Sequence, residues 1–207
     1  MTREGVRGAL EAIVLAGGAG ARFGGGKLTH PWRGGALIDG ALAAAFAAPA
    51  RTVTVVTGAD PRVEAAAAAF AASVGEAARL RIVHCEGHAE GMGATLRAGV
   101  ASLPPDAAGA YVFLGDMPAI PAAAPPALAE ALAAGAPAAA PRFKGQRGHP
   151  VLFGAALFPQ LSALAGDQGA REVLRALGGA LALVETDDPG VLVDIDRPSD
   201  LDGPDAR

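Results

Sequence analysis

Short apolar runs alternate with alanine-rich helical stretches along most of the chain. The runs are continuous in their hydrophobicity, as is typical of strands buried on both faces of a parallel sheet. The pattern predicts strands at Ala12–Leu15, Thr52–Val56, Leu80–His84, Tyr111–Leu114, Pro150–Phe153, Leu181–Val184 and Val191–Asp194. It predicts helices at Ala36–Ala48, Asp60–Ala72, Thr95–Ala101, Pro126–Ala133, Ala155–Leu161 and Ala170–Leu177. This alternation predicts an α/β fold with a largely parallel, doubly wound sheet, whose ligands bind at the carboxyl ends of the strands.

One stretch could be mistaken for a domain boundary. Residues 122–140 are low-complexity Ala/Pro sequence, but too few residues follow them to build a second core without the first sheet. We therefore predict a single domain over residues 1–207. Ala138–Arg142, the loop Phe143–His149 and the strand after it are expected to form a β-ribbon that crosses back over the sheet edge.

Composition excludes several classes of protein. Hydrophobic residues make up 51% of the 207, yet Gly, Pro and charges interrupt every run that would be long enough to span a bilayer. The amino-terminal residues lack the apolar region of a signal peptide, and the single Cys85 is interpreted as a small buried hydrophobe. A net charge of −4 without a basic block argues against a nucleic-acid partner. We expect a cytoplasmic protein that neither binds nucleic acid nor enters a membrane.

A glycine-dense loop carrying two cations, Arg22 and Lys27, follows the first strand. Glycines let successive backbone N–H groups turn inward and form an anion-binding concavity. The loop is not a Walker A motif, because Leu28 follows Lys27 where a hydroxyl residue is needed. It is not a dinucleotide fingerprint either, because Phe23 replaces the third glycine. The loop predicts a phosphate cradle, and the alternative is a flexible turn with two solvated cations.

Two acidic positions predict a metal site. Asp116 follows an apolar strand, which places its carboxylate at the carboxyl edge of the sheet. Asp196 belongs to the segment Asp194-Ile195-Asp196, whose alternation puts its two carboxylates on one face of an extended chain. Asp116 and Asp196 together would make a hard oxygen site suited to Mg²⁺. The alternatives are an N-cap at Asp116 and an acidic cap on a terminal turn, a role that we assign to Asp200.

These motifs resemble those of a known family. Leu15-Ala16-Gly17-Gly18-x-Gly20-x-Arg22-Phe23-Gly24-x-x-Lys27-Leu28 is similar to the opening signature of the MobA-like nucleotidyltransferases, which include the molybdenum cofactor guanylyl- and cytidylyltransferases. Leu114-Gly115-Asp116-Met117-Pro118 and the closing Asp194-Ile195-Asp196-Arg197-Pro198 resemble later family motifs, and all appear in family order. The resemblance implies a three-layer α/β/α, Rossmann-like fold of the nucleotide-diphospho-sugar transferase type, with a mostly parallel mixed sheet.

The resemblance also implies roles for individual residues. Arg22, Lys27 and Asp116 would be catalytic, and Asp116 and Asp196 would hold Mg²⁺. The nucleotide would be bound by Leu15, Ala16, Gly17, Gly18, Gly20, Arg22, Lys27, Gly91, Met92 and Gly93. The acceptor would be bound by His149, Asp167 and Arg171. His149 could instead be a satisfied strand-edge histidine, and Met92 a core residue at a loop–helix junction. His30, His84 and His88 have no metal-like spacing, so no role is predicted for them.

The implied reaction is transfer of CMP from CTP to the phosphate of molybdopterin, with pyrophosphate released. Gly91-Met92-Gly93 resembles the cytidylyl branch, whereas Ala16-Gly17-Gly18 resembles the guanylyl branch, so GTP is the alternative nucleotide. The product would pass to a molybdenum hydroxylase apoenzyme or its chaperone. Two more functions stay open at this point: a sugar- or alditol-phosphate nucleotidyltransferase, and a nucleotide-binding protein without turnover.

Overall fold

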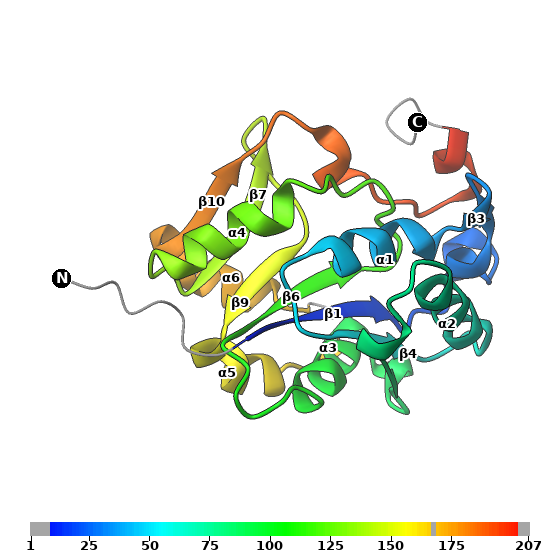
Figure 1. Ribbon diagram of the computed structural model, residues 1–207, viewed down its shortest axis with the longest axis horizontal. Coiled ribbons are helices and arrows are strands. Elements are labelled where there is room, and N and C mark those ends of the chain that lie inside the picture. Colours follow the sequence, from blue (N-terminus) through cyan, green and yellow to red (C-terminus); the bar gives the residue numbers. More distant parts are fainter. Residues whose placement is uncertain (1–8, 167–168, 203–207) are drawn as a thin grey trace.

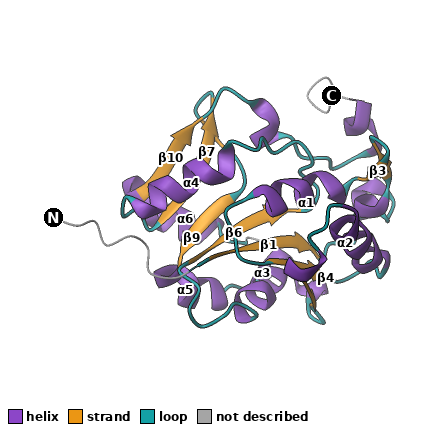
Figure 2. Ribbon diagram, in the orientation of Figure 1, coloured by secondary structure: helices purple, strands orange, loops and turns teal. Residues whose placement is uncertain are grey.

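A mixed eight-stranded sheet forms the centre of the protein (Figures 1 and 2). The computed structural model describes residues 9–166 and 169–202. The strands of the sheet are β1 (Leu10–Ala16), β4 (Val53–Thr57), β5 (Leu80–His84), β6 (Gly109–Leu114), β7 (Ala138–Phe143), β8 (Gln146–Arg147), β9 (Val151–Gly154) and β10 (Leu181–Glu185). They are ordered β5-β4-β1-β6-β9-β7-β10, with β8 paired to β7. A separate ribbon joins β2 (Pro31–Trp32) to β3 (Gly35–Ala36).

The strand directions set the edge at which the site forms. β1 runs parallel to β4 and β6, and β4 runs parallel to β5. β9 is antiparallel to both β6 and β7, while β10 is parallel to β7. The carboxyl ends of β1, β4, β5 and β6 therefore lie at one edge, where loops from distant parts of the sequence can meet.

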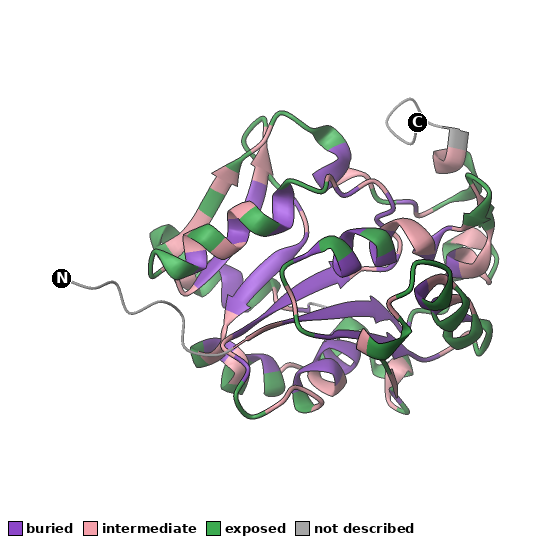
Figure 3. Ribbon diagram, viewed as in Figure 1, coloured by how far each residue is buried: buried purple, intermediate pink, exposed green. Residues whose placement is uncertain are grey.

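Helices cover both faces of the sheet and give three layers. One face carries α1 (Ile38–Ala47), α2 (Arg62–Ser73) and α4 (Ala124–Ala133). The other carries α3 (Met92–Ala101), α5 (Phe158–Ser162) and α6 (Arg171–Leu177). Successive residues of β1 enter opposite cores, with Val14 in the first and Ile13 in the second. The burial of β1 on both faces explains the apolar run Ala12–Ala16 within it, and Figure 3 shows the central strands buried.

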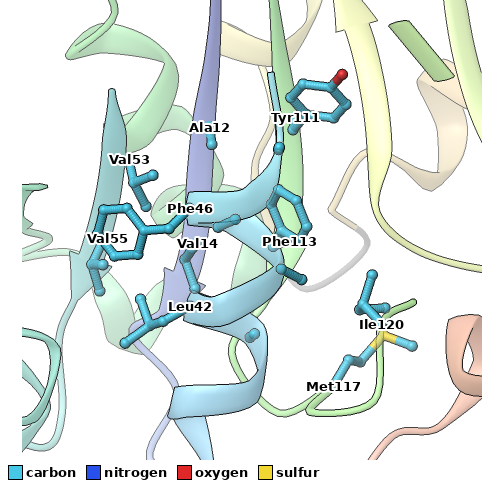
Figure 4. Packing of buried hydrophobic residues seen from close by; sticks show 14 of the residues in the cluster. Ala12, Val14, Leu42, Phe46, Val53, Val55, Tyr111, Phe113, Met117 and Ile120 are labelled. Carbon is cyan, nitrogen blue, oxygen red and sulfur yellow. The ribbon is translucent and has the colours of Figure 1, made fainter. Parts of the chain in front are cut away.

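Small residues let the helices approach the strands closely. A Cβ on Gly99 of α3 would lie 2.8 Å from a methyl carbon of Ile13. A Cβ on Gly40 of α1 would lie 2.2 Å from the carbonyl oxygen of Pro118, in the turn after β6. On the α1 face of the sheet, Figure 4 shows Leu42 and Phe46 of α1 packed among core residues of the strands. This packing fixes the turn that carries Asp116.

A buried polar network closes the opposite end of β1. Glu11 is fully buried and accepts hydrogen bonds from Arg51 Nε at 2.7 Å and from the backbone N and side-chain Oγ1 of Thr52 at 3.0 and 2.6 Å. Arg51 also donates two hydrogen bonds to Asp106, both at 2.8 Å. Both oxygens of the buried carboxylate have hydrogen-bond partners, which offsets the free-energy cost of burying its charge. The network therefore links the start of β1 to the residues just before β4.

The predicted α/β, three-layer fold is confirmed, and most predicted elements differ from the observed ones by one to three residues. The predicted strand at Val191–Asp194 is wrong, because that segment forms a 3₁₀ turn, Pro189–Leu192, followed by irregular chain. It crosses the carboxyl edge of the sheet, where the backbone N of Ile195 donates to the carbonyl of Asp116 at 3.1 Å.

The predicted β-ribbon is present, since β7 pairs antiparallel with β8 and β9, but its predicted crossing over the sheet edge is wrong. Its strands, β7 and β9, instead enter the sheet, and β9 pairs directly with β6. Their small and apolar side chains, such as Ala138 and Val151, are buried between the helical layers, which accounts for the placement. Within the described residues, no helix is both long and apolar enough to cross a membrane.

Candidate active site

The glycine loop after β1 forms one wall of a cleft. Gly20, Gly24 and Gly26 have φ values of 61°, 92° and 63°, which side chains with a Cβ rarely adopt. A Cβ on Gly17 would lie 2.9 Å from Oγ1 of Thr95 in α3, so the loop can pass α3 only with glycine there. The folded loop brings Arg22 and Lys27 towards the end of β6, and it leaves Gly18 open to the cleft.

Three carboxylates converge across from this loop. One side-chain oxygen from each of Asp116, Asp194 and Asp196 lies within 4.8 Å of the other two. Asp200 fixes the closing segment, because its Oδ2 accepts the backbone N–H groups of Asp196 and Arg197 at 2.9 and 2.8 Å. The predicted capping role of Asp200 is therefore confirmed. Partial burial and the negative charge of Asp116 raise the pKa of Asp194 to about 6.

The two loop cations lie against these carboxylates. Lys27 Nζ donates to Asp116 Oδ2 at 2.7 Å and lies 3.5 Å from Asp196 Oδ1, and its side chain is only 11% exposed. Burial acts to lower the pKa of Lys27, but the attraction of Asp116 and the neighbouring carboxylates outweighs it, so the pKa is raised. Arg22 Nη1 donates to Asp196 Oδ2. The cluster is thus already arranged around positive charge.

The cluster fits a hard divalent cation. Carboxylate oxygens are the preferred protein ligands of such ions, and opposite ligands of octahedral Mg²⁺ are about 4.2 Å apart. The observed spread of 4.8 Å requires only small side-chain movements to reach that geometry. A bound cation would also relieve the repulsion that raises the pKa of Asp194. Asp116, Asp194 and Asp196 are therefore the residues that could hold a metal.

Two adjoining pockets meet beside the carboxylates. The larger is a cleft of about 650 Å³ between the glycine loop and the start of α3. It is lined by Leu15, Ala16, Gly17, Gly18, Gly20, Arg22, Lys27, His88, Gly91, Met92, Thr95, Leu114, Asp116 and Asp196, among others. The smaller, of about 420 Å³, contains His149, Arg147, Arg171 and Asp194. Leu15, Met92 and Leu114 line both pockets, so a ligand in one can touch a ligand in the other.

The structure brings together nearly all of the predicted site residues. The predicted nucleotide-binding positions line the larger cleft, except Gly93, which is buried behind it with no room for a Cβ beside Gly166. His149 and Arg171 line the smaller pocket. Asp167 lies outside the described residues.

Sequence reasoning missed several residues that line the two pockets. Asp194 was visible in the alternation of the closing segment, and Arg147 stands two residues before His149. His88 lines the nucleotide cleft although it was given no role, because it was considered only as a metal ligand. No spacing signal identified Thr95, whose position against Gly17 depends on the packing of α3 on β1.

His149 has a distinct environment within the smaller pocket. Burial, and then the positive charge of Arg147, lower the pKa of His149 to about 4, so the imidazole is neutral near pH 7. Its Nδ1 atom is buried without a hydrogen-bond partner in the described part of the chain. The satisfied strand-edge histidine considered from the sequence is therefore not what the structure shows.

The three-layer fold, with two pockets that meet at a carboxylate cluster, is the Rossmann-like fold found in nucleotidyltransferases. Solved structures share it. Rv0371c from Mycobacterium tuberculosis H37Rv has 25% identity and a TM-score of 0.75, over 94% of this chain and 96% of that one. A nucleotidyl transferase from Methanothermobacter thermautotroptrophicus, Mth528, has 25% identity and a TM-score of 0.74, over 93% and 94% of the two chains.

The family follows from the sequence itself. Residues 12–181 match the MobA-like NTP transferase domain, and the chain belongs to this family. A 4-diphosphocytidyl-2C-methyl-D-erythritol synthase from Anaerococcus prevotii shares the fold, with 12% identity and a TM-score of 0.74 over 94% and 93% of the chains. A second structure of Rv0371c is a complex with manganese; it has 22% identity and a TM-score of 0.65, over 86% and 88%. Among the curated proteins, no sequence match is found.

Proposed function

We propose that the protein transfers CMP from CTP to the phosphate of molybdopterin, with Mg²⁺ as the metal and pyrophosphate as the second product. The observation that carries the proposal is the meeting of two pockets at the carboxylate cluster. A triphosphate on the glycine loop would present its α-phosphorus at Asp116 and Asp196. An acceptor in the second pocket would approach the same point beside Asp194.

The chemistry of the acceptor explains which residues are needed. A phosphate monoester has a second pKa near ~6, so it is largely dianionic at neutral pH and needs no strong general base. One of its oxygens forms a bond to the α-phosphorus of CTP, while the bond from that phosphorus to the bridging oxygen breaks and pyrophosphate leaves. Both reactants are anions, so the site must neutralise and align them.

The residues of the loop meet that need. The glycine-loop N–H groups would hold the triphosphate, and Lys27 and Arg22 would move from their carboxylate partners to the phosphate oxygens. Mg²⁺ held by Asp116, Asp194 and Asp196 would supply the Lewis acid that offsets charge on the leaving pyrophosphate. Delivery of the product to a molybdenum hydroxylase apoenzyme or its chaperone is proposed on the family resemblance alone.

CTP is the proposed nucleotide because Gly91 and Met92, from the segment similar to the cytidylyl branch, line the nucleotide cleft. GTP is the second candidate, because Ala16-Gly17-Gly18 resembles the guanylyl branch. A base pocket built on hydrogen bonds discriminates strongly, because the wrong base leaves its polar groups unpaired.

The test is pyrophosphate release with each of the four NTPs and Mg²⁺, with and without molybdopterin. We expect release only when CTP and molybdopterin are both present. A higher kcat/KM with GTP would assign the protein to guanylyl transfer. Turnover with a sugar phosphate but not with molybdopterin would reject the proposed acceptor while leaving nucleotidyl transfer intact.

A further inference from the structure

The smaller pocket combines an apolar floor with two arginines from distant segments. Side chains such as Leu96, Val112 and Phe153 form the floor. Arg147 comes from β8 and Arg171 from the first residue of α6, and both line the pocket. A cavity of this kind suits a ligand with a flat or apolar body and an anionic group.

In the part of the chain that the structure describes, neither arginine is paired with a carboxylate. Within residues 9–166 and 169–202, no hydrogen bond or ion pair joins Arg147 or Arg171 to a carboxylate, whereas the nearby Arg142 pairs with Glu185. Two of the nearby carboxylates have other partners, because Asp116 pairs with Lys27 and Asp196 with Arg22. Asp194 lines the pocket, but among the described residues it forms no ion pair with either arginine. The two guanidinium groups are therefore available to a ligand.

The two arginines also repel each other electrostatically. Burial, and then the positive charge of Arg171, lower the pKa of Arg147. Like charges facing one partly desolvated pocket repel, and an anion between them would remove that repulsion. His149 lines the same pocket with its buried, unpartnered Nδ1, so a second polar group among the described residues there lacks a partner. Both observations indicate that this pocket binds a ligand that carries an anionic group.

We infer that Arg147 and Arg171 form an anion clamp that binds the acceptor, separately from the triphosphate site on the glycine loop. The inference rests on the proposed function for the name of the acceptor, molybdopterin, but the clamp is defined by its own residues. Arginine pairs suit planar, bidentate recognition of phosphate and similar anions. The anion is either the acceptor's phosphate or its dithiolene sulfur pair, and the apolar floor receives the ring system.

The kinetic test compares Arg147→Gln, Arg171→Gln and the double variant with Arg175→Gln. Arg175 lies on the same helix as Arg171 but does not line the pocket, so its variant is a matched control. Loss of one charge-assisted contact should raise the KM for molybdopterin roughly 10- to 100-fold, and leave the KM for CTP within about twofold. The control should match the wild type. An unchanged KM for molybdopterin, or an equal rise in both KM values, would overturn the clamp.

The source of the anion is tested with molybdopterin from which the phosphate has been removed. Binding is measured by calorimetry for the wild type and the double variant, without turnover. If the clamp holds the phosphate, the two proteins should bind the dephosphorylated ligand equally. If it holds the dithiolene, the double variant should lose affinity for both ligands by the same factor. Equal binding of both ligands by both proteins would contradict the inference.

A final arm separates failure of the clamp from failure of the proposed function. NMR resonances of the arginine side-chain N–H groups are followed while phenyl phosphate is added to the wild-type protein. We expect the resonances of Arg147 and Arg171 to shift in a saturable way and that of Arg175 to stay. If these shifts occur but molybdopterin neither binds nor reacts, the anion clamp is supported and molybdopterin is rejected as the acceptor. If the chemical shifts of Arg147 and Arg171 do not change, the clamp is rejected, whatever activity the enzyme has.

Discussion

Replacing Lys27 by Met tests whether its ammonium takes the place of a metal among the carboxylates. Lys27 Nζ lies 2.7 Å from Asp116 Oδ2 and 3.5 Å from Asp196 Oδ1, and the side chain is 11% exposed. Met keeps most of the apolar stem and removes the charge. The variant therefore leaves Asp116, Asp194 and Asp196 with less positive charge to hold them together.

The size of the effect follows from this geometry. A charge-assisted hydrogen bond contributes about 1.5–3 kcal/mol, and the partial burial of Lys27 places the loss near ~2 kcal/mol. For a protein of 207 residues this lowers the Tm by roughly 4–8 °C in the absence of metal. Mg²⁺ should bind the variant about tenfold more tightly or better, because a competing cation has been removed from its site. Turnover should fall by about 10²–10³, since a phosphate clamp is lost.

The assay is thermal unfolding over a Mg²⁺ titration, with chelator as the zero point and kcat measured in parallel. Lys144→Met is the control, because Lys144 is exposed and stacks on Phe143 away from the carboxylates. We expect the Lys27 variant to be less stable than the wild type in chelator and to gain more from Mg²⁺. If its gain is equal to or smaller than that of the wild type, Lys27 does not occupy the metal position and the reasoning fails.

Three further experiments test other parts of the structure. Asp194→Asn should lower kcat about 10²-fold with stability retained, and adding Asp116→Asn should lower it little more, because residues acting through one ion are not additive; full additivity in the kinetics would argue against a shared site. Gly58→Ala places a Cβ 2.6 Å from the carbonyl oxygen of Gly17 in the glycine loop, so it should raise the KM for CTP and lower the free energy of unfolding by about 1–3 kcal/mol. Gly179→Ala is the control, because a Cβ there meets no atom within 4 Å, and it should change neither quantity. Glu11→Ala should reduce the free energy of unfolding by about 3–5 kcal/mol, measured in urea, with kcat per folded molecule unchanged; reduced kcat would show that the network reaches the site.

The sequence predicts the layers and the first half of the sheet well, because β1, β4 and β6 are buried on both faces and consist mostly of apolar and β-branched residues. The glycine loop and Asp116 are also predictable, since strand order alone puts both at one edge. Prediction fails where the chain's path depends on distant partners. The segment around Val191 has strand-like residues but lies outside the sheet. Its contact is with a distant part of the chain, because the carbonyl of Val191 accepts a hydrogen bond from the backbone N of His149.

The second pocket is less predictable for the same reason. Arg147 and Arg171 are 24 positions apart in the sequence and line one pocket only because the fold brings β8 and the start of α6 together there. Resemblance to the family motifs indicates Arg171 in advance, but no spacing signal pairs it with Arg147. The single-domain organisation over residues 1–207 stays a prediction. The individual roles of the site residues also stay predictions, and the substitutions above test several of them.

The most direct measurement of the proposed reaction follows the nucleotide itself. CTP labelled at its α-phosphorus is incubated with the protein, Mg²⁺ and molybdopterin, and the products are separated. We predict that the label moves into a pyrophosphate-bridged compound of CMP and molybdopterin, in equal amount to the pyrophosphate released. Label found only in CTP or free CMP, with molybdopterin unchanged, would contradict this prediction.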